Sequence, residues 1–153
     1  YLLDDTIRNN ITFGIEKAEI DENLLSDVVE KSQLTNLINS LPNKLNTLIG
    51  DRGARLSGGE KQRIGIARAL YNKPKVMIFD EATSSLDLYN ENKILNEIYE
   101  NKKGKTLIII SHRNNTVKYC DLIYVMEDGK IIDNGTFDQI MKKHSYLKEN
   151  VVT

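Results

Sequence analysis

Two short apolar runs, with a helix-length segment between them, most limit the folds open to this chain. The first run, residues 76–79, leads into Asp80 and Glu81, and the second covers residues 106–110. Neither run alternates with polar residues, which is typical of parallel strands buried on both faces. Between the runs, Asp87 precedes apolar residues at helical spacing and is a good helix cap. Strand, helix and strand in this order predict an α/β fold.

Three helices are expected in the first 40 residues. A stretch within residues 1–14 has apolar residues on one face, with Asp4 or Asp5 as its cap. The next helix covers residues 21–31 and is capped by its first residue. A short third helix covers residues 33–40 and is stopped by Leu41-Pro42.

An antiparallel tail is expected after the second strand. Residues 122–126 and 130–132 flank Asp128-Gly129, a pair typical of two-residue hairpin turns. Thr136 and Gln139 then form a capping box, which predicts a last helix.

Another predicted helix opens with the stretch Leu56-Ser57-Gly58-Gly59-Glu60-Lys61-Gln62-Arg63. Ser57 is a good N-cap, and Glu60 three residues later completes a capping box. The two glycines leave the helix N-terminus bare and positively polarised, so that an anion can approach it closely. By itself this pattern indicates a capped helix, and the residues downstream are needed to indicate more.

In their order and spacing, these features resemble the nucleotide-binding domain of ABC transporters over essentially the whole chain. Residues 56–62 look like the signature motif, and residues 76–81 look like Walker B with its adjoining glutamate. Residues 85–87 look like the D-loop, and His112 looks like the switch histidine. The resemblance implies the C-terminal part of a P-loop NTPase (RecA-like) parallel-sheet core with an ABC-specific α-helical subdomain.

The resemblance also implies an ATPase that uses ATP and Mg²⁺. Asp80 suits the Mg²⁺, because hard cations take carboxylate ligands. Glu81 suits the attacking water, as general base or as the group that orients it, and His112 suits a contact to the γ-phosphate, so these two are the expected catalytic residues. The expected nucleotide-binding residues are Leu56, Ser57, Gly58, Gly59, Glu60, Gln62 and Asp87.

The sequence contains no Walker A motif. Residues 53–61 fail the G-x-x-x-x-G-K-[ST] spacing at the lysine position, and residues 104–106 lack the first glycine and lead into a strand. The Q-loop and the aromatic that stacks on adenine would lie upstream of Tyr1. We therefore expect a piece of a longer protein, inactive as an ATPase by itself, with the helical subdomain at residues 1–72 and the core at residues 73–153.

Composition and charge narrow the class of partner. The 153 residues are 40% hydrophobic and 28% charged, and the net charge of -1 is spread along the chain, which leaves no footprint for nucleic acid. No apolar run approaches the length of a bilayer span.

The resemblance implies a second nucleotide-binding domain packed head to tail and a transmembrane domain fused upstream. It places the chain at the cytoplasmic face of the cell's inner membrane.

Residues 47–53 favour an exporter over an importer. They resemble the loop that touches the transmembrane helices in exporter-type members, with Asp51 where glutamate is common.

Two alternative functions stay open at this point. An SMC-type chromosome-organising or repair ATPase also carries its signature far from Walker A, although no heptads precede the signature here. A soluble ABC protein of translation would carry two cassettes and more basic linkers.

Overall fold

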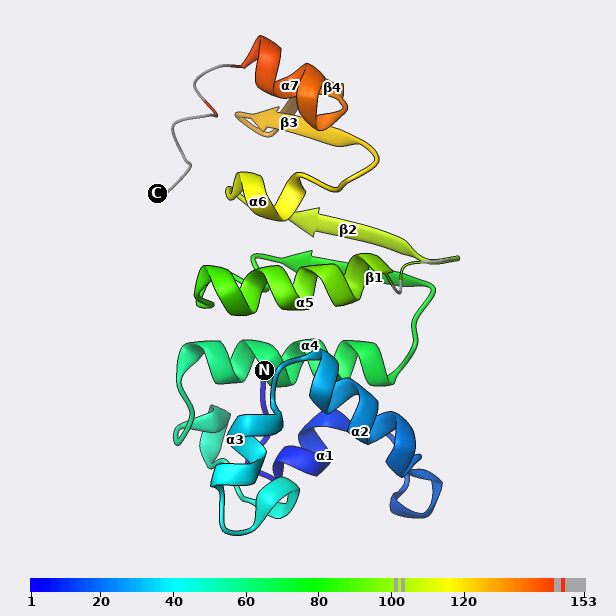
Figure 1. Ribbon diagram of the computed structural model, residues 1–153, viewed down its shortest axis with the longest axis vertical. Coiled ribbons are helices and arrows are strands. Elements are labelled where there is room, and N and C mark those ends of the chain that lie inside the picture. Colours follow the sequence, from blue (N-terminus) through cyan, green and yellow to red (C-terminus); the bar gives the residue numbers. More distant parts are fainter. Residues whose placement is uncertain (101, 103, 145–146, 148–153) are drawn as a thin grey trace. The chain divides into compact units, whose positions relative to one another are not determined.

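The computed structural model describes residues 1–100, 102, 104–144 and 147. They form two compact units: the first takes the described residues within 1–77 and 82–107, and the second takes those within 78–81 and 108–147. Helices dominate the first unit, and a hairpin with two short helices forms most of the second (Figure 1). The division into a helical subdomain and a core, expected from the sequence, stays a prediction.

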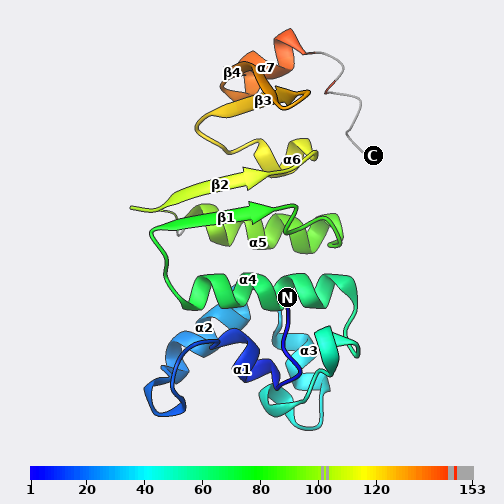
Figure 2. The same ribbon diagram turned by 180° about the vertical axis from the view of Figure 1, so that it is seen from behind.

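Helices α1, α2 and α4 form the centre of the first unit. Both α1 and α2 pack against α4, and Figure 2 shows them on the same side of it. The described helices of this unit are α1 (Ile7–Ile11), α2 (Glu22–Lys31), α3 (Thr35–Ser40), α4 (Gly58–Tyr71) and α5 (Leu88–Glu100), with the 3₁₀ turns η1 (Lys17–Glu19), η2 (Lys44–Asn46) and η3 (Asp51–Gly53). The side chains with almost no exposure are mainly aliphatic, and include Ile7, Ile11, Leu25, Leu34, Ile49, Ile64, Ile94 and Ile98.

Polar bonds to α4 supplement this apolar core. The Arg68 side chain donates from Nε to the carbonyl of Asn10 at 2.6 Å and from Nη2 to the Asn10 side-chain oxygen at 2.9 Å. The Tyr71 hydroxyl accepts from the backbone amide of Asp21 at 2.9 Å. Because Asn10 is fully buried, its bonds to the guanidinium satisfy groups that would otherwise be costly to bury.

Among the first three helices, one cap agrees with the sequence prediction and two boundaries correct it. Asp21 caps α2 by accepting from the amide of Leu24, as expected. The cap of α1 is Thr6, and the prediction of Asp4 or Asp5 is wrong; the Asp5 carboxylate instead accepts from the Thr6 amide. The third helix begins later than expected, because Gln33 has a φ of 57° and leaves the helical region.

Strands β1 (Val76–Asp80) and β2 (Thr106–Ile110) lie next to each other. The Thr106 amide donates to the Lys75 carbonyl at one end, and the Glu81 amide donates to the Ile110 carbonyl at the other. The first residues of the two strands therefore meet, as do the last, so the pair is parallel and the predicted α/β fold is confirmed.

The expectation that both faces of these strands are buried is wrong. Met77 and Phe79 are buried, but Val76 and Ile78 are 53% and 65% exposed. In β2, Ile110 is 52% exposed. Burial on both faces requires a covering layer on each side of a sheet, and the described residues cover one side.

The second unit is built on the predicted hairpin. Strands β3 (Ile123–Glu127) and β4 (Lys130–Gly135) pair antiparallel, and both contact α7 (Phe137–Lys143). The turn residues Asp128 and Gly129 have φ values of 47° and 73°, as a type I′ turn requires. Thr136 and Gln139 form the expected capping box of α7. A short helix, α6 (Asn114–Val117), precedes the hairpin.

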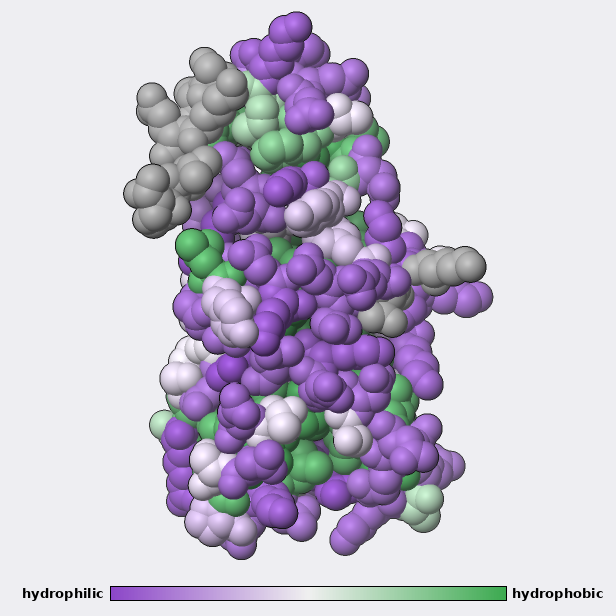
Figure 3. Space-filling model, viewed as in Figure 1, coloured by the Kyte–Doolittle hydropathy of each residue, from purple (hydrophilic) through white to green (hydrophobic). Residues whose placement is uncertain are grey.

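The surface is mainly hydrophilic on the face shown in Figure 3, with smaller hydrophobic areas among the helices of the first unit and beside α7. No helix in the described part of the chain combines the length and the apolar character that a membrane span requires.

A charged cluster joins α7 to β4 in the second unit. His144 Nε2 donates to one carboxylate oxygen of Asp133 at 3.0 Å, and Lys143 Nζ lies 3.1 Å from both. The His144 bond, followed by the Lys143 bond and the Asn134 amide, holds the pKa of Asp133 at about 2. An unfolded aspartate titrates near pH ~3.9, so the unfolded chain takes up this proton first as the pH falls.

We expect Asp133→Asn to lower the melting temperature of the chain at pH 7, because the ionised carboxylate is the form that the folded state favours. This contribution is fully present above the unfolded pKa and is lost as the pH falls through about 2. Thermal unfolding of both proteins at pH 7, 4 and 2 checks the prediction. A difference in melting temperature that stays constant over this range would contradict it.

Candidate functional site

The N-terminus of α4 has the capped geometry predicted from the sequence. The Ser57 side chain accepts from the Glu60 amide at 3.3 Å, and a Glu60 carboxylate oxygen accepts from the Ser57 amide at 2.7 Å. The amides of Gly58 and Gly59 are the first two of the helix, so they have no carbonyl within the helix to bond to. Ser57 and Gly58 are exposed. This end of the helix therefore presents amide donors and a positive dipole to an approaching anion.

The two glycines at this end of the helix lie against Ser85 and Leu86. A Cβ at Gly58 would come 3.4 Å from the Ser85 side chain. A Cβ at Gly59 would come 3.0 Å from the Ser85 carbonyl oxygen and 3.2 Å from Leu86. Gly58 thus has room for a small side chain, whereas Gly59 is needed for close packing.

Gln62 joins the same two segments. Its side-chain nitrogen donates to the Ser84 hydroxyl at 3.0 Å, and its side-chain oxygen accepts from the Ser85 amide at 2.9 Å. Leu56, the first residue of the predicted signature, is half-buried, and its amide donates to the Gly53 carbonyl. The structure therefore brings residues 56–62 together with residues 83–87, all within the first unit.

Asp87 caps α5, as the sequence predicts. It accepts from the Asn90 amide at 3.0 Å and from the Asn90 side chain at 2.6 Å. The backbone bond from Asn90, followed by its side-chain bond, holds the pKa of Asp87 below its ordinary value. Asp87 is exposed, so with this lowered pKa its carboxylate stays ionised at neutral pH.

A buried glutamate supports this segment and is absent from the site predicted by sequence. Glu91 is fully buried in the first turn of α5 and accepts from the hydroxyl of Thr83 at 2.8 Å. The sequence pattern could have indicated this burial, because Glu91 lies at helical spacing on the same face as Ile94, Leu95 and Ile98. A charged residue on a buried stripe implies a polar partner.

Asp80, Glu81 and His112 lie at the carboxyl ends of β1 and β2, in the second unit. His112 Nδ1 donates to a Glu81 carboxylate oxygen at 3.3 Å. Asp80, Glu81 and His112 are all exposed. Glu81 has a φ of 47°, a region that side chains adopt at a cost and that is often found at functional sites. The structure thus joins the two predicted catalytic residues, 31 positions apart in the chain.

These residues fit the groups that the resemblance implies. Mg²⁺ is usually held by one or two carboxylates together with phosphates and water, and the exposed carboxylate of Asp80 meets that need. The described residues hold no cluster of three or more histidine, cysteine or acidic side chains that would bind a metal by themselves. The bare start of α4 fits a phosphate, because its amides are donors.

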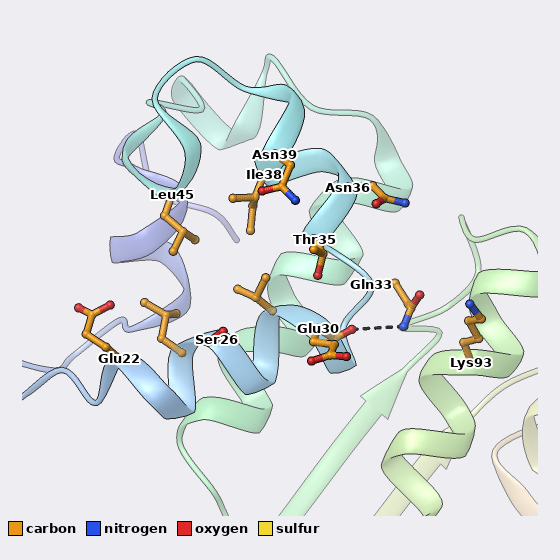
Figure 4. A pocket seen from close by; sticks show the side chains of 12 residues that line it. Glu22, Ser26, Glu30, Gln33, Thr35, Asn36, Ile38, Asn39, Leu45 and Lys93 are labelled. Atoms are coloured by element: carbon orange, nitrogen blue, oxygen red, sulfur yellow. Dashed lines mark hydrogen bonds between the residues drawn. The ribbon is translucent and has the colours of Figure 1, made fainter.

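One cavity in the described residues lies away from these side chains. It has a volume of about 670 Å³ and is lined by α2, α3, the η2 turn and Lys93 of α5 (Figure 4). Its floor includes Leu25, Val29 and Ile38, which are buried, and its rim is polar. None of the predicted site residues lines it, so this cavity does not mark the predicted nucleotide site.

Comparison with known proteins identifies one family. A family model described as ABC transporter matches residues 4–84, just over half of the chain. ABC transporter B family member 6 of Dictyostelium discoideum is 44% identical over 146 residues, which are 95% of this chain and 20% of that protein. ABC multidrug transporter mdr1 of Aspergillus fumigatus is 38% identical over 150 residues, which are 98% of this chain and 11% of that protein.

A solved structure, that of a bacterial Atm1-family ABC exporter with ATP bound, has the same fold. It matches with a TM-score of 0.89 and 33% identity over 97% of this chain and 26% of that one. The chain thus spans about a quarter or less of the proteins that it matches here.

Proposed function

The chain belongs to the ABC transporter family, and we propose that the protein containing it hydrolyses ATP to export a substrate across a membrane. The observation that carries this proposal is the contact between Glu81 and His112 beside Asp80. A base, a histidine and a metal-binding carboxylate at the ends of two parallel strands are groups that hydrolysis of a bound nucleotide uses, together with a phosphate-binding loop. The relatives described above are transporters, which favours this function over that of an SMC-type or a translation ATPase.

Each group at the strand ends has a role in this proposal. Glu81 accepts a proton from the attacking water or orients it, and His112 contacts the γ-phosphate while its other ring nitrogen bonds Glu81. Asp80 holds Mg²⁺, directly or through water. When bound, Mg²⁺ neutralises charge on the β- and γ-phosphates. Leu56, Ser57, Gly58, Gly59, Glu60, Gln62 and Asp87 complete the proposed nucleotide-binding set.

Two partners and a location follow from the same proposal. A second nucleotide-binding domain packs head to tail, so that each signature meets the nucleotide of the other domain. A transmembrane domain in the same protein receives the signal, which places this chain at the cytoplasmic face of the cell's inner membrane. We also propose that the 153-residue chain alone hydrolyses no appreciable ATP, because its sequence lacks the Walker A motif.

The two histidines of the chain provide a matched test of the proposed function. In the complete protein reconstituted in vesicles, His112→Ala is expected to lower MgATP turnover about 10- to 100-fold, through loss of a hydrogen bond to a charged group. His144→Ala removes a histidine that bonds Asp133, and is expected to leave turnover within about twofold. Equal effects of the two variants, or an active His112→Ala protein, would contradict the role of His112. Absence of MgATP hydrolysis by the unaltered protein would contradict the function itself.

A further inference from the structure

The side chain of Gln62, in α4, bonds both residue 84 and residue 85. The Ser85 amide can only donate, so the Gln62 atom facing it is the oxygen, and the nitrogen then faces the Ser84 hydroxyl. Both ends of the amide are therefore used within the chain. These bonds cross 22 and 23 positions of sequence and connect the helix that begins at the signature to the segment that ends at Asp87.

The packing of Gly59 reinforces this connection. Because a Cβ there would meet the Ser85 carbonyl oxygen at 3.0 Å, the start of α4 and the backbone of residue 85 are in contact without any intervening side chain. On the other side, the bond from Thr83 to the buried Glu91 holds the same segment to α5. Residues 83–87 are thus held between two helices of one unit.

We propose that Gln62 is a positioning residue, and that it holds residues 84–87 and the N-terminus of α4 as one body that meets the nucleotide together. This inference rests on the proposed function and replaces the expectation that Gln62 is itself a nucleotide ligand. The amide nitrogen of Gln62 bonds Ser84 and its oxygen bonds Ser85, both in its own chain, as a positioning role requires. Ser57 and Gly58 then supply the anion-binding groups, and Gln62 sets where Asp87 lies relative to them.

The first test is Gln62→Met, which keeps the length of the side chain and removes both hydrogen bonds, in the complete protein. We expect kcat for ATP to fall about 10- to 100-fold, since small misplacements of active groups have effects of this size, with KM for ATP within about twofold. Gln62→Glu restores most of kcat, because its oxygens accept from the Ser85 amide and the Ser84 hydroxyl. A rise in KM with kcat unchanged would show Gln62 to be a ligand and overturn the proposal.

The second test separates positioning from general destabilisation. Gly59→Ala brings a methyl group against residue 85, whereas Gly65→Ala, in the same helix, has nothing within 4 Å. We expect Gly59→Ala to lower kcat and to speed hydrogen exchange at the Ser85 amide, as Gln62→Met does, and Gly65→Ala to do neither. Unchanged exchange at Ser85 in both Gln62→Met and Gly59→Ala would overturn the proposal, even where the unaltered protein is an active ATPase. An inactive unaltered protein would instead overturn the proposed function.

Discussion

Replacing Glu81 with glutamine in the complete protein is expected to lower ATP turnover about 10²- to 10⁴-fold while ATP still binds, because general-base catalysis contributes a factor of this size. The amide has the shape of the carboxylate but lacks its basicity. Glutamine also suits the backbone as well as glutamate does, since the φ of 47° at this position strains both equally. Loss of turnover in this variant is therefore a chemical effect.

Steady-state hydrolysis and equilibrium binding of labelled ATP measure the two quantities separately. Glu127→Gln is the control, because it makes the same chemical change at an exposed glutamate at the end of β3. It is expected to leave both quantities near those of the unaltered protein. Turnover of Glu81→Gln within about threefold of the unaltered protein would remove Glu81 from the mechanism.

Replacing Gly58 with aspartate is expected to disable the nucleotide site of the partner domain, and to spare the site of its own chain. A Cβ fits at Gly58, 3.4 Å from Ser85, so the lesion is the carboxylate that it sets against a phosphate. Gly58→Ala adds the carbon without the charge and is the matched control. In the proposed head-to-tail dimer, the bare start of α4 meets the nucleotide of the partner domain, because its free amides attract an anion.

A mixed dimer tests this arrangement. One subunit lacks a functional Walker A, and the other carries Gly58→Asp. If the signature acts on the partner's nucleotide, both lesions fall on one composite site, and roughly half of the nucleotide trapping survives at the other. Placing both lesions in one subunit then disables both sites. The opposite pair of results, no trapping in the mixed dimer and half in the doubly altered one, would show that each signature serves its own chain.

Local sequence was enough to predict the elements of the site. The capping box of Ser57 and Glu60, the cap at Asp87 and the turn at Asp128-Gly129 were all predicted and are confirmed. Each depends on bonds or backbone angles within about four residues, so the residue types at those positions largely decide the outcome. The family motifs added the expected roles of Asp80, Glu81 and His112, which stay predictions.

Contacts between distant residues were decided by the tertiary structure. The contact of Glu81 with His112 and the two bonds of Gln62 join residues 22 to 31 positions apart, and no spacing rule relates such positions. The same reason accounts for the errors. Thr6 caps α1 in place of Asp4 or Asp5, because the Asp5 carboxylate accepts from Thr6 and from Asn9.

The sequence by itself thus determined the order and type of the elements and the chemistry at their ends, because helix caps, turns and apolar periodicity are local properties. Only the tertiary structure decided which faces are covered and which side chains meet. Ile78 is exposed although it lies in an apolar run, while the polar side chain of Glu91 is fully buried. Burial depends on what packs against a residue and on the hydrogen bonds available there, and both are set by contacts beyond the residue's own turn or strand.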